Sequence, residues 1–438
     1  MGGDSVKRLR AIAVGAMSAL VLPFAAAAVF APPLAAQVAD GNRFWTEGRF
    51  DDAKAAYETE LRTNPASVRS LYRLAVLASW EDRLDSARTL AARARALEPA
   101  DPDVRALEAQ LDAWSGRFRS AVARYDSVMA DHPERRAELS LPRDRARAWS
   151  RPAAELSAGW NNDSDDNTSW WQSLGLSAPI GNRLRVFASA GAQQSSDPVR
   201  DADRLLAEGG ITATPGRTTV TLAAGARRLT AAGFRRTEPT ARAALRYRLA
   251  PRSSLSASYS HVPFDETAQL IGSGIDIDAV EGSAEIGAGG GLSLTAGGGG
   301  AWFSDGNDRY AVFAAATLTV AERFFVGALA RQMGYEFRGT GYFSPDRFRI
   351  AEGRAGWSYR SPEWSVRVSG GLGAQQAFRG ADAQAEWHGE ARVGRGWGPG
   401  GVDRNIIEIF GGISSSLESS ASGAFRYRTA GLRVSVGL

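Results

Sequence analysis

The sequence predicts an α+β protein whose helices and strands lie in separate domains. An N-terminal α-helical repeat solenoid is followed by an antiparallel transmembrane β-barrel of about 16 strands. Three observations lead to this prediction. A period of 34 residues runs through residues 37–135. Residues 152–438 alternate between apolar and polar side chains in short segments separated by turn residues. Residues 1–36 have the composition of an export signal.

The export signal has three parts. Lys7, Arg8 and Arg10 form a basic stretch, an apolar run covers residues 11–31, and small residues before Gln37 offer a cleavage site. Because the chain contains no cysteine, disulfides and thiolate metal sites are excluded. The formal net charge is only +4, from 52 basic and 48 acidic residues, so we expect no nucleic acid partner.

Small residues and prolines recur with the 34-residue period in about three units. This repeat signature consists of Gly41, Ala53, Pro65, Ala75, Ala87, Pro99, Ala109, Ala121 and Pro133. The spacing matches the tetratricopeptide pattern, in which small residues lie where the two helices of a hairpin touch. Such solenoids bind proteins or peptides, so we expect a protein partner, whose identity the repeats alone do not give. The alternative is that the repeats act only as a spacer.

Residues 136–151 are expected to link the repeats to the barrel of residues 152–438. Within the barrel, Leu255–Tyr259 illustrates the alternation of a strand with one apolar face. Tight turns alternate with longer polar loops, as in outer-membrane barrels, whereas a soluble β-sandwich has no reason for that regularity. The expected longer loops are residues 161–169, 195–203, 231–238, 262–274, 304–308, 338–346, 377–383 and 417–423.

The alternation also predicts which side chains face the lumen. Apolar residues such as Leu245 are expected to contact outer membrane lipid, with tryptophans near strand ends in aromatic girdles. Basic residues of opposite parity are expected to line the substrate path: Arg185, Arg242, Arg246, Arg248 and Arg367. About sixteen strands enclose a water-filled interior, so this arrangement predicts a conduit.

Catalytic and metal-binding groups are poorly represented. Ser260 and His261 are adjacent in a strand, which puts their side chains on opposite faces, so a serine–histidine pair is not expected. His132 is expected to end a helix, and His388 lies in a strand beside Trp387. The oxygen-rich residues 161–167 lack the spacing of a calcium loop. We therefore expect no enzymatic activity, no metal site and no cofactor.

One motif carries a family resemblance. Gly341, Tyr342, Phe343, Ser344 and Pro345, followed by Asp-Arg-Phe, resemble the Gly-Tyr-Phe-Ser-Pro-Gln-x-Tyr segment of cellulose synthase operon protein C. The later Gly-Gly-Leu-Gly run at residues 370–373 is also similar. That family places tetratricopeptide repeats before an outer-membrane barrel that exports a polysaccharide. The three repeats expected here are fewer than the family carries, which weakens the implied link to an inner-membrane synthase.

The resemblance implies an outer-membrane protein, with its repeats in the periplasm, that exports an exopolysaccharide such as a cellulose-like chain. Two other hypotheses remain open: a membrane-anchored adaptor whose repeats recruit an envelope protein, and a general diffusion porin. For the loop over residues 339–348 there are also two expectations. Its aromatic residues either present ring faces to a polymer or pack against neighbouring loops at the rim.

Overall fold

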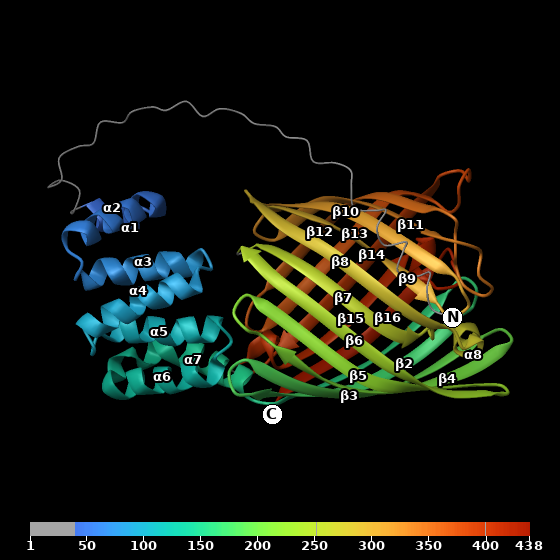
Figure 1. The fold of residues 1–438 in the computed structure, drawn as a ribbon, viewed down its shortest axis with the longest axis horizontal. Helices are drawn as coiled ribbons and strands as arrows, with labels where there is room; N and C mark the ends of the chain where they lie inside the picture. Colours follow the sequence, from blue (N-terminus) through green and yellow to red (C-terminus); the bar gives the residue numbers. More distant parts are fainter. Residues whose placement is uncertain (1–39, 251, 399) are drawn as a thin grey trace, which may run out of the picture. The chain divides into compact units, whose positions relative to one another are not determined.

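The computed structural model describes residues 40–250, 252–398 and 400–438 (Figure 1). The predicted signal peptide, residues 1–36, lies outside the described residues. The chain divides into two compact units, which meet in sequence between Thr63 and Asn64. The expected combination of a helical region and an antiparallel barrel is confirmed.

Between residue 40 and the barrel, the described part of the chain forms seven α-helices. The first unit contains α1 (Asp40–Thr46) and α2 (Phe50–Thr63). The second unit begins with α3 (Val68–Trp80), α4 (Leu84–Leu97), α5 (Pro102–Trp114), α6 (Phe118–Asp131), the short 3₁₀ helix η3 (Pro133–Arg135) and α7 (Arg136–Ser150). Local capping fixes where several of them begin. The Asp101 side chain, for example, accepts hydrogen bonds from the amides of Asp103 and Val104 at the start of α5.

The small residues of the repeat signature are buried between paired helices. The five alanines of the signature are all fully buried: Ala53, Ala75, Ala87, Ala109 and Ala121. A hydrogen bond also recurs. The Tyr57 hydroxyl donates to Asn42 at 2.9 Å in the first repeat, and the Tyr125 hydroxyl donates to Gln110 at 2.9 Å in the third. The second repeat has Ala91 at the equivalent position, and an alanine side chain cannot make this hydrogen bond.

Residues 136–151, expected as a linker, form α7 almost throughout, although Pro142 lies inside the helix. Leu139 and Ala146 of α7 are buried in the same hydrophobic cluster as Tyr125 and Met129 of α6. The stretch therefore covers the apolar face of the last repeat, as a capping helix does in a solenoid.

Sixteen antiparallel strands form a closed barrel, in which β1 pairs with β16. They are β1 (Ala153–Asp163), β2 (Thr168–Ile180), β3 (Leu184–Asp197), β4 (Arg200–Ala213), β5 (Thr218–Ala231), β6 (Phe234–Ala250), β7 (Ser253–Pro263), β8 (Asp276–Gly289), β9 (Leu292–Phe303), β10 (Asp308–Ala321), β11 (Phe324–Tyr335), β12 (Phe348–Arg360), β13 (Trp364–Gln376), β14 (Gln384–Gly396), β15 (Ile406–Ser414) and β16 (Tyr427–Gly437). Among the described residues, no helix has the length and apolar character needed to cross a membrane.

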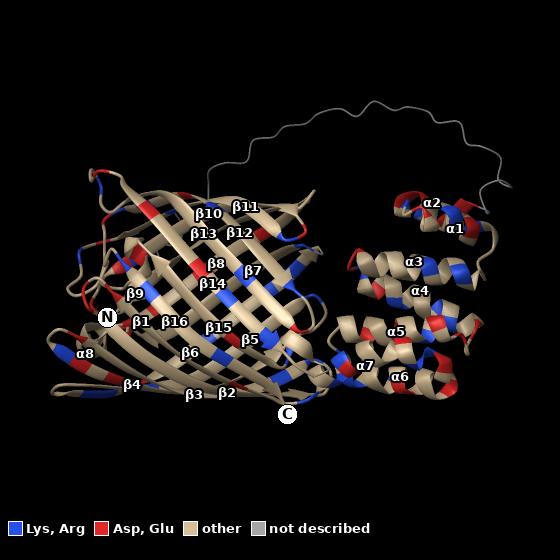
Figure 2. Ribbon diagram, turned by 180° about the vertical axis from the view of Figure 1, so that it is seen from behind, with Lys and Arg blue, Asp and Glu red and all other residues tan. Residues whose placement is uncertain are grey.

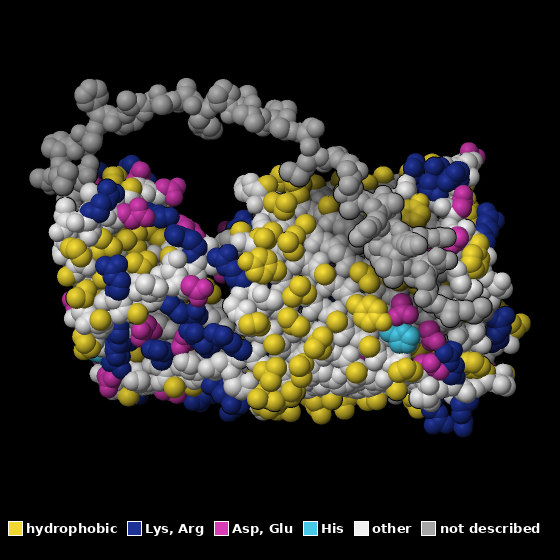
Figure 3. Space-filling view, viewed as in Figure 1, with side chains coloured by type: hydrophobic (Ala, Val, Ile, Leu, Met, Phe, Trp, Pro, Cys, Tyr) yellow, Lys and Arg dark blue, Asp and Glu magenta, His cyan; other side chains and the backbone are white. Residues whose placement is uncertain are grey.

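Side chains alternate between the two faces of the barrel wall. In β6, Leu245, Tyr247 and Leu249 are 45%, 41% and 44% exposed and belong to an apolar outer surface (Figure 3). The intervening Arg246 has the opposite parity and lies 3.6 Å from Glu285, so it faces the interior. This arrangement follows from the two-residue period of a strand.

The connections differ in part from the expectation. Three expected loops are mostly strand: the β1–β2, β3–β4 and β5–β6 connections cover only residues 164–167, 198–199 and 232–233. Their polar flanks pair in register, for instance Asp197 with Arg200. Polarity misled the prediction because strands can continue beyond the apolar band, where polar side chains are solvated. The longer connections at the same end are residues 264–275 with α8 (Ala268–Ser273), 336–347, 377–383, and 415–426 with η5 (Leu417–Ser419).

Candidate functional site: the barrel lumen and its loops

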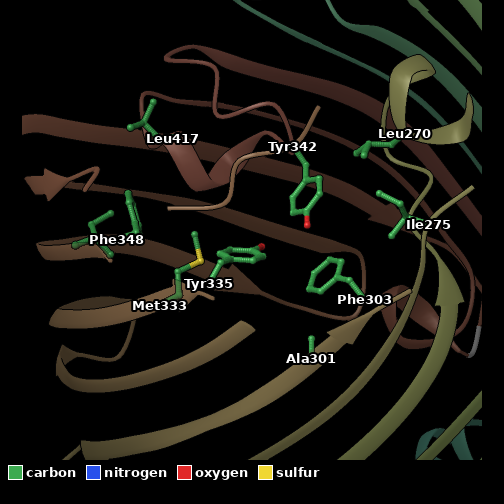
Figure 4. Close-up of a cluster of buried hydrophobic side chains, with 10 residues drawn as sticks. Leu270, Ile275, Ala301, Phe303, Met333, Tyr335, Tyr342, Phe348 and Leu417 are labelled. Carbon is green, nitrogen blue, oxygen red and sulfur yellow. The ribbon is translucent and has the colours of Figure 1, made fainter. Parts of the chain in front are cut away.

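A hydrophobic cluster joins three of the longer connections to the barrel wall (Figure 4). We call it the loop cluster. It consists of Leu270, Ile275, Ala301, Phe303, Met333, Tyr335, Tyr342, Phe348, Ile350 and Leu417. Phe303 and Tyr335 come from β9 and β11, whereas Leu270, Tyr342 and Leu417 come from three different loops. These loops therefore pack against one another and against inward-facing residues of the wall.

Tyr342 of the sequence motif lies in the middle of this cluster and is only 6% exposed. Its ring stacks on Phe303 with centroids 5.5 Å apart and contacts Tyr335 at 5.9 Å. Its hydroxyl accepts a hydrogen bond from Asn307 at 2.8 Å and donates one to Asp305 at 2.9 Å. Burial raises the pKa of the Tyr342 phenol. The ring is therefore occupied by protein contacts on both its apolar and its polar sides.

The other motif residues fix the path of the same loop. Gly341 has a φ of +89°, a region that favours glycine. Phe343 meets Phe348 edge-on at 5.6 Å, and its amide donates to the Ala421 carbonyl at 2.7 Å. Ser344 accepts a hydrogen bond from the Gly339 amide at 2.7 Å, and the Pro345 carbonyl accepts one from Tyr335. The motif thus connects the β11–β12 loop to the β15–β16 loop.

A buried ion-pair network anchors the loop that carries α8. Asp265 is 3% exposed and accepts hydrogen bonds from Arg204 at 2.9 Å and from Arg227 at 2.8 Å. The apolar side chains of α8 are buried: Ile271 packs with Leu229 of β5, and Leu270 belongs to the loop cluster. Because α8 contacts β3, β4 and β5, the loop is held against the inner wall.

The β15–β16 loop is anchored by polar contacts. Gln375 accepts a hydrogen bond from the Leu417 amide at 3.0 Å and donates one to the Ser415 carbonyl at 3.0 Å. Glu418 pairs with Arg331 of β11 at 2.9 Å. Burial raises the pKa of the Glu418 carboxyl, and the nearby Arg331 opposes that shift. Glu418 therefore brings a carboxylate from the loop into the interior.

Beneath the loop cluster, the lumen contains a cavity of about 600 Å³. Arg246, Arg309 and Arg354 line it together with acidic groups such as Glu281. Figure 2 shows basic and acidic residues interspersed along the strands. The interior is therefore polar and of mixed charge.

The structure places the predicted arginines as follows. Arg242 and Arg246 lie 3.6 Å from Glu208 and Glu285, respectively. Arg185 donates to the Ser177 hydroxyl at 3.1 Å.

Of the remaining two predicted arginines, Arg367 lies in β13 and Arg248 lies near the end of β6. Arg367 lies over the ring of Phe325, 5.4 Å from its centroid. Arg248 lies at the turn end of β6, where its amide donates to the Arg217 carbonyl at 2.9 Å. The five arginines therefore do not converge on one site.

Sequence reasoning missed the acidic partners of these arginines. Parity could have identified them: Glu208 is opposite in parity to the exposed Leu205 and Ile211 of β4, and Glu285 is opposite to the exposed Val280 and Ile286 of β8. One aromatic pair faces inward. Trp171, for which the outer girdle was the favoured position and the lumen the alternative, stacks on Phe410 with centroids 6.3 Å apart. It lies on the same face of β2 as Ser169 and Ser173, whose hydroxyls bond across the inner wall.

Comparison with known proteins gives a family match for the repeats and structural matches over 66% of the chain. The tetratricopeptide repeat family model matches residues 44–111, which confirms the repeats. No curated protein sequence matches the chain. Among solved structures, a bacterial polysaccharide outer membrane secretin aligns with a TM-score of 0.54 at 12% identity, covering 66% of this chain and 99% of the other.

Two structures from Pseudomonas aeruginosa also align with this chain. OccK5 (OpdH) covers 66% of this chain and 98% of its own at 11% identity, with a TM-score of 0.37. OpdO covers 66% and 96% at 13% identity, with a TM-score of 0.38. At these identities the comparisons show the fold alone. The chain has tetratricopeptide repeats followed by a closed antiparallel β-barrel.

Proposed function

We propose that this protein is an outer-membrane conduit for an exopolysaccharide, with its repeats in the periplasm. The observation that carries the proposal is the polar, mixed-charge lumen, with three loops packed against its inner wall through the loop cluster. The fold likeness to the polysaccharide outer membrane secretin, at a TM-score of 0.54, supports it. We regard the protein as a passage and not as an enzyme.

The charge pattern favours a neutral or zwitterionic polymer over a strongly anionic one. Arg242 and Arg246 each lie near a glutamate, so the positive charge that an anionic chain would meet is largely compensated. Paired charges still offer hydrogen-bond donors and acceptors to sugar hydroxyls. The stacked Trp171 and Phe410 add apolar ring surface on the inner wall, which suits the C–H faces of sugar rings.

The packed loops favour a gated conduit over a general diffusion porin. A polymer can pass only if the loops that share the loop cluster move, since Tyr342 and Leu417 are buried in it. Loop movement of this kind is a common gating device in channels and enzymes. The repeats, as protein-binding modules, are the natural point at which a periplasmic or synthase-complex protein signals to the channel.

Secretion of the polymer in a deletion strain tests the proposal. The strain is complemented with the full chain, or with a variant that lacks residues 40–135 but retains the export signal and α7, and both secreted polysaccharide and folded barrel are measured. Loss of polymer in the deletion strain, restored by the full chain, supports export. Equal polymer with and without the protein contradicts it. A folded barrel without polymer in the truncated variant assigns recruitment to the repeats.

Epitope insertion tests the orientation. A tag at Asp305, in the β9–β10 turn at the loop end, is expected to be accessible on intact cells. A tag at Gly216, in the β4–β5 turn at the opposite end, is expected to be protected until the outer membrane is permeabilised. Accessibility of the Gly216 tag alone would reverse the topology.

A further inference from the structure

We propose that Glu352, Glu386 and His388 form a binding site for a divalent cation of the zinc type on the inner wall of the barrel. The site goes beyond the proposed function, because it depends on the wall itself and on no property of a polymer. The sequence predicts no metal site, since the three side chains come from two strands that are not adjacent.

The strand register brings the three groups together. Glu352 of β12 pairs with Gly373 of β13, which in turn pairs with Glu386 of β14. His388 pairs with Gly371 two residues away on the same strands. Leu372 is 68% exposed on the outer surface, so the glycines on either side of it face inward.

Because Gly371 and Gly373 have no side chains, there is room over β13 for the three ligand side chains. A Cβ atom at Gly371 would lie 2.2 Å from Cε1 of His388, and one at Gly373 would lie 2.7 Å from the Cβ of Glu352. Because β13 carries no side chain on its inner face at these positions, groups from β12 and β14 approach each other over it. These glycines belong to the Gly-Gly-Leu-Gly run noted in the sequence.

The distances between potential ligand atoms suit a single ion. Nδ1 of His388 lies 3.1 Å from Oε2 of Glu352 and 3.3 Å from Oε1 of Glu386. The ligand atoms of all three residues fall within 4.8 Å of one another. Two ligands bound at about 2.1 Å in a tetrahedral arrangement are separated by about 3.4 Å. An ion could therefore bind with little movement of the side chains.

The electrostatics of the cluster call for additional positive charge. The side chains of Glu352 and Glu386 are each only 1% exposed. Arg354 pairs with Oε1 of Glu352 and so orients that carboxylate. Among the described residues, none donates a hydrogen bond to Oε2 of Glu386. An imidazole that binds a metal is neutral, so with His388 in that form the guanidinium of Arg354 balances only one of the two buried carboxylates.

The ligand types select the class of ion. One imidazole nitrogen and two carboxylate oxygens suit Zn²⁺ and neighbouring first-row metals, with water completing the coordination. Ca²⁺ and Mg²⁺ prefer sites composed of oxygen ligands alone, and Ca²⁺ takes six to eight of them. The site is therefore expected to bind Zn²⁺ in preference to either of these ions.

Zinc binding to the purified, untagged protein in detergent tests the proposal. The protein is stripped with a chelator, titrated with ZnCl₂ by calorimetry, and analysed for bound metal after dialysis. Wild type is expected to bind one equivalent, and Glu386→Gln and His388→Ala are each expected to weaken binding by at least roughly 100-fold. CaCl₂ and MgCl₂ are expected to give no comparable binding.

Two further variants keep the result interpretable. His261→Ala is the matched control, because Nδ1 of His261 lies 3.1 Å from Asp278, an arrangement with only one carboxylate; its zinc binding should equal that of wild type. Gly371→Ala retains all three ligands but displaces the His388 ring, so it should also weaken binding. Heat-modifiable migration on gels verifies that each barrel is folded. Absence of bound zinc in wild type, or equal zinc binding in His388→Ala and wild type, would overturn the proposal.

Discussion

Removing the Tyr342 side chain should open the loop end of the barrel. Tyr342→Phe deletes the hydroxyl that bonds Asn307 at 2.8 Å and Asp305 at 2.9 Å, at a cost of about 1–3 kcal/mol. Tyr342→Ala also deletes the ring stacked on Phe303, for about 3–5 kcal/mol in total. Because the barrel wall keeps its own hydrogen bonds, most of this cost should fall on loop packing. A tenfold shift requires about 1.4 kcal/mol, so Tyr342→Ala should raise the open population by roughly two to three orders of magnitude.

Single-channel recording in planar bilayers measures that population directly. Wild type should be mostly closed, Tyr342→Phe should open briefly, and Tyr342→Ala should conduct for most of the recording. Tyr310→Phe is the control, since this tyrosine is 45% exposed on the outer surface. If Tyr342→Ala conducts no more than wild type, or if Tyr310→Phe opens the channel equally, the loop cluster does not close the lumen.

Three further predictions concern the wall, the pH response and the repeats. Leu245→Arg, which places a charge against lipid, should destabilise the barrel by about 2–4 kcal/mol, whereas Arg246→Leu should cost less than about 1 kcal/mol. Urea unfolding in vesicles measures both free energies. Equal effects would contradict the assignment of Leu245 to the outer face and Arg246 to the inner face of β6. The pKa of Glu418 is raised in the folded state, so its contribution to loop packing is present at low pH and lost as pH rises through that pKa. Conductance should therefore increase with pH, and Glu418→Gln should flatten the profile; an unchanged profile would exclude this group. Tyr125→Phe should lower the stability of the repeats by about 1–2 kcal/mol, seen by helical circular dichroism, without changing barrel migration.

Periodicity was sufficient to predict the fold, because both parts of the chain repeat a local pattern. The 34-residue spacing of Ala53, Ala87 and Ala121 identifies positions that are all fully buried between helices. Alternation along a strand predicts which side chains face outward and which face the lumen, as Leu245 and Arg246 show. Local patterns of this kind are readable because each helix bonds its own backbone and nearly every strand pairs with the strands next to it in the sequence.

The candidate sites were harder to predict, because they depend on contacts between distant segments. The bond between Tyr342 and Asn307 joins two connections, and no spacing in the sequence indicates it. Likewise, Glu352 and Glu386 approach each other only because an intervening strand carries glycine at the shared register position. Polar strand ends such as Asp197 were read as loop, since composition does not distinguish a solvated strand from a turn.

Among the described strands, all but one of the pairings join strands that are consecutive in the sequence. The exception is the seam between β1 and β16, where Ala153 pairs with Gly437. Each hairpin can therefore form as soon as its second strand has been translocated, but the cylinder stays open until the last strand arrives. A chain that lacked β16 would retain two unpaired edges, on β1 and β15, and unpaired edges recruit other strands. Completion of this single seam is thus what separates a closed cylinder from a sheet with two aggregation-prone edges.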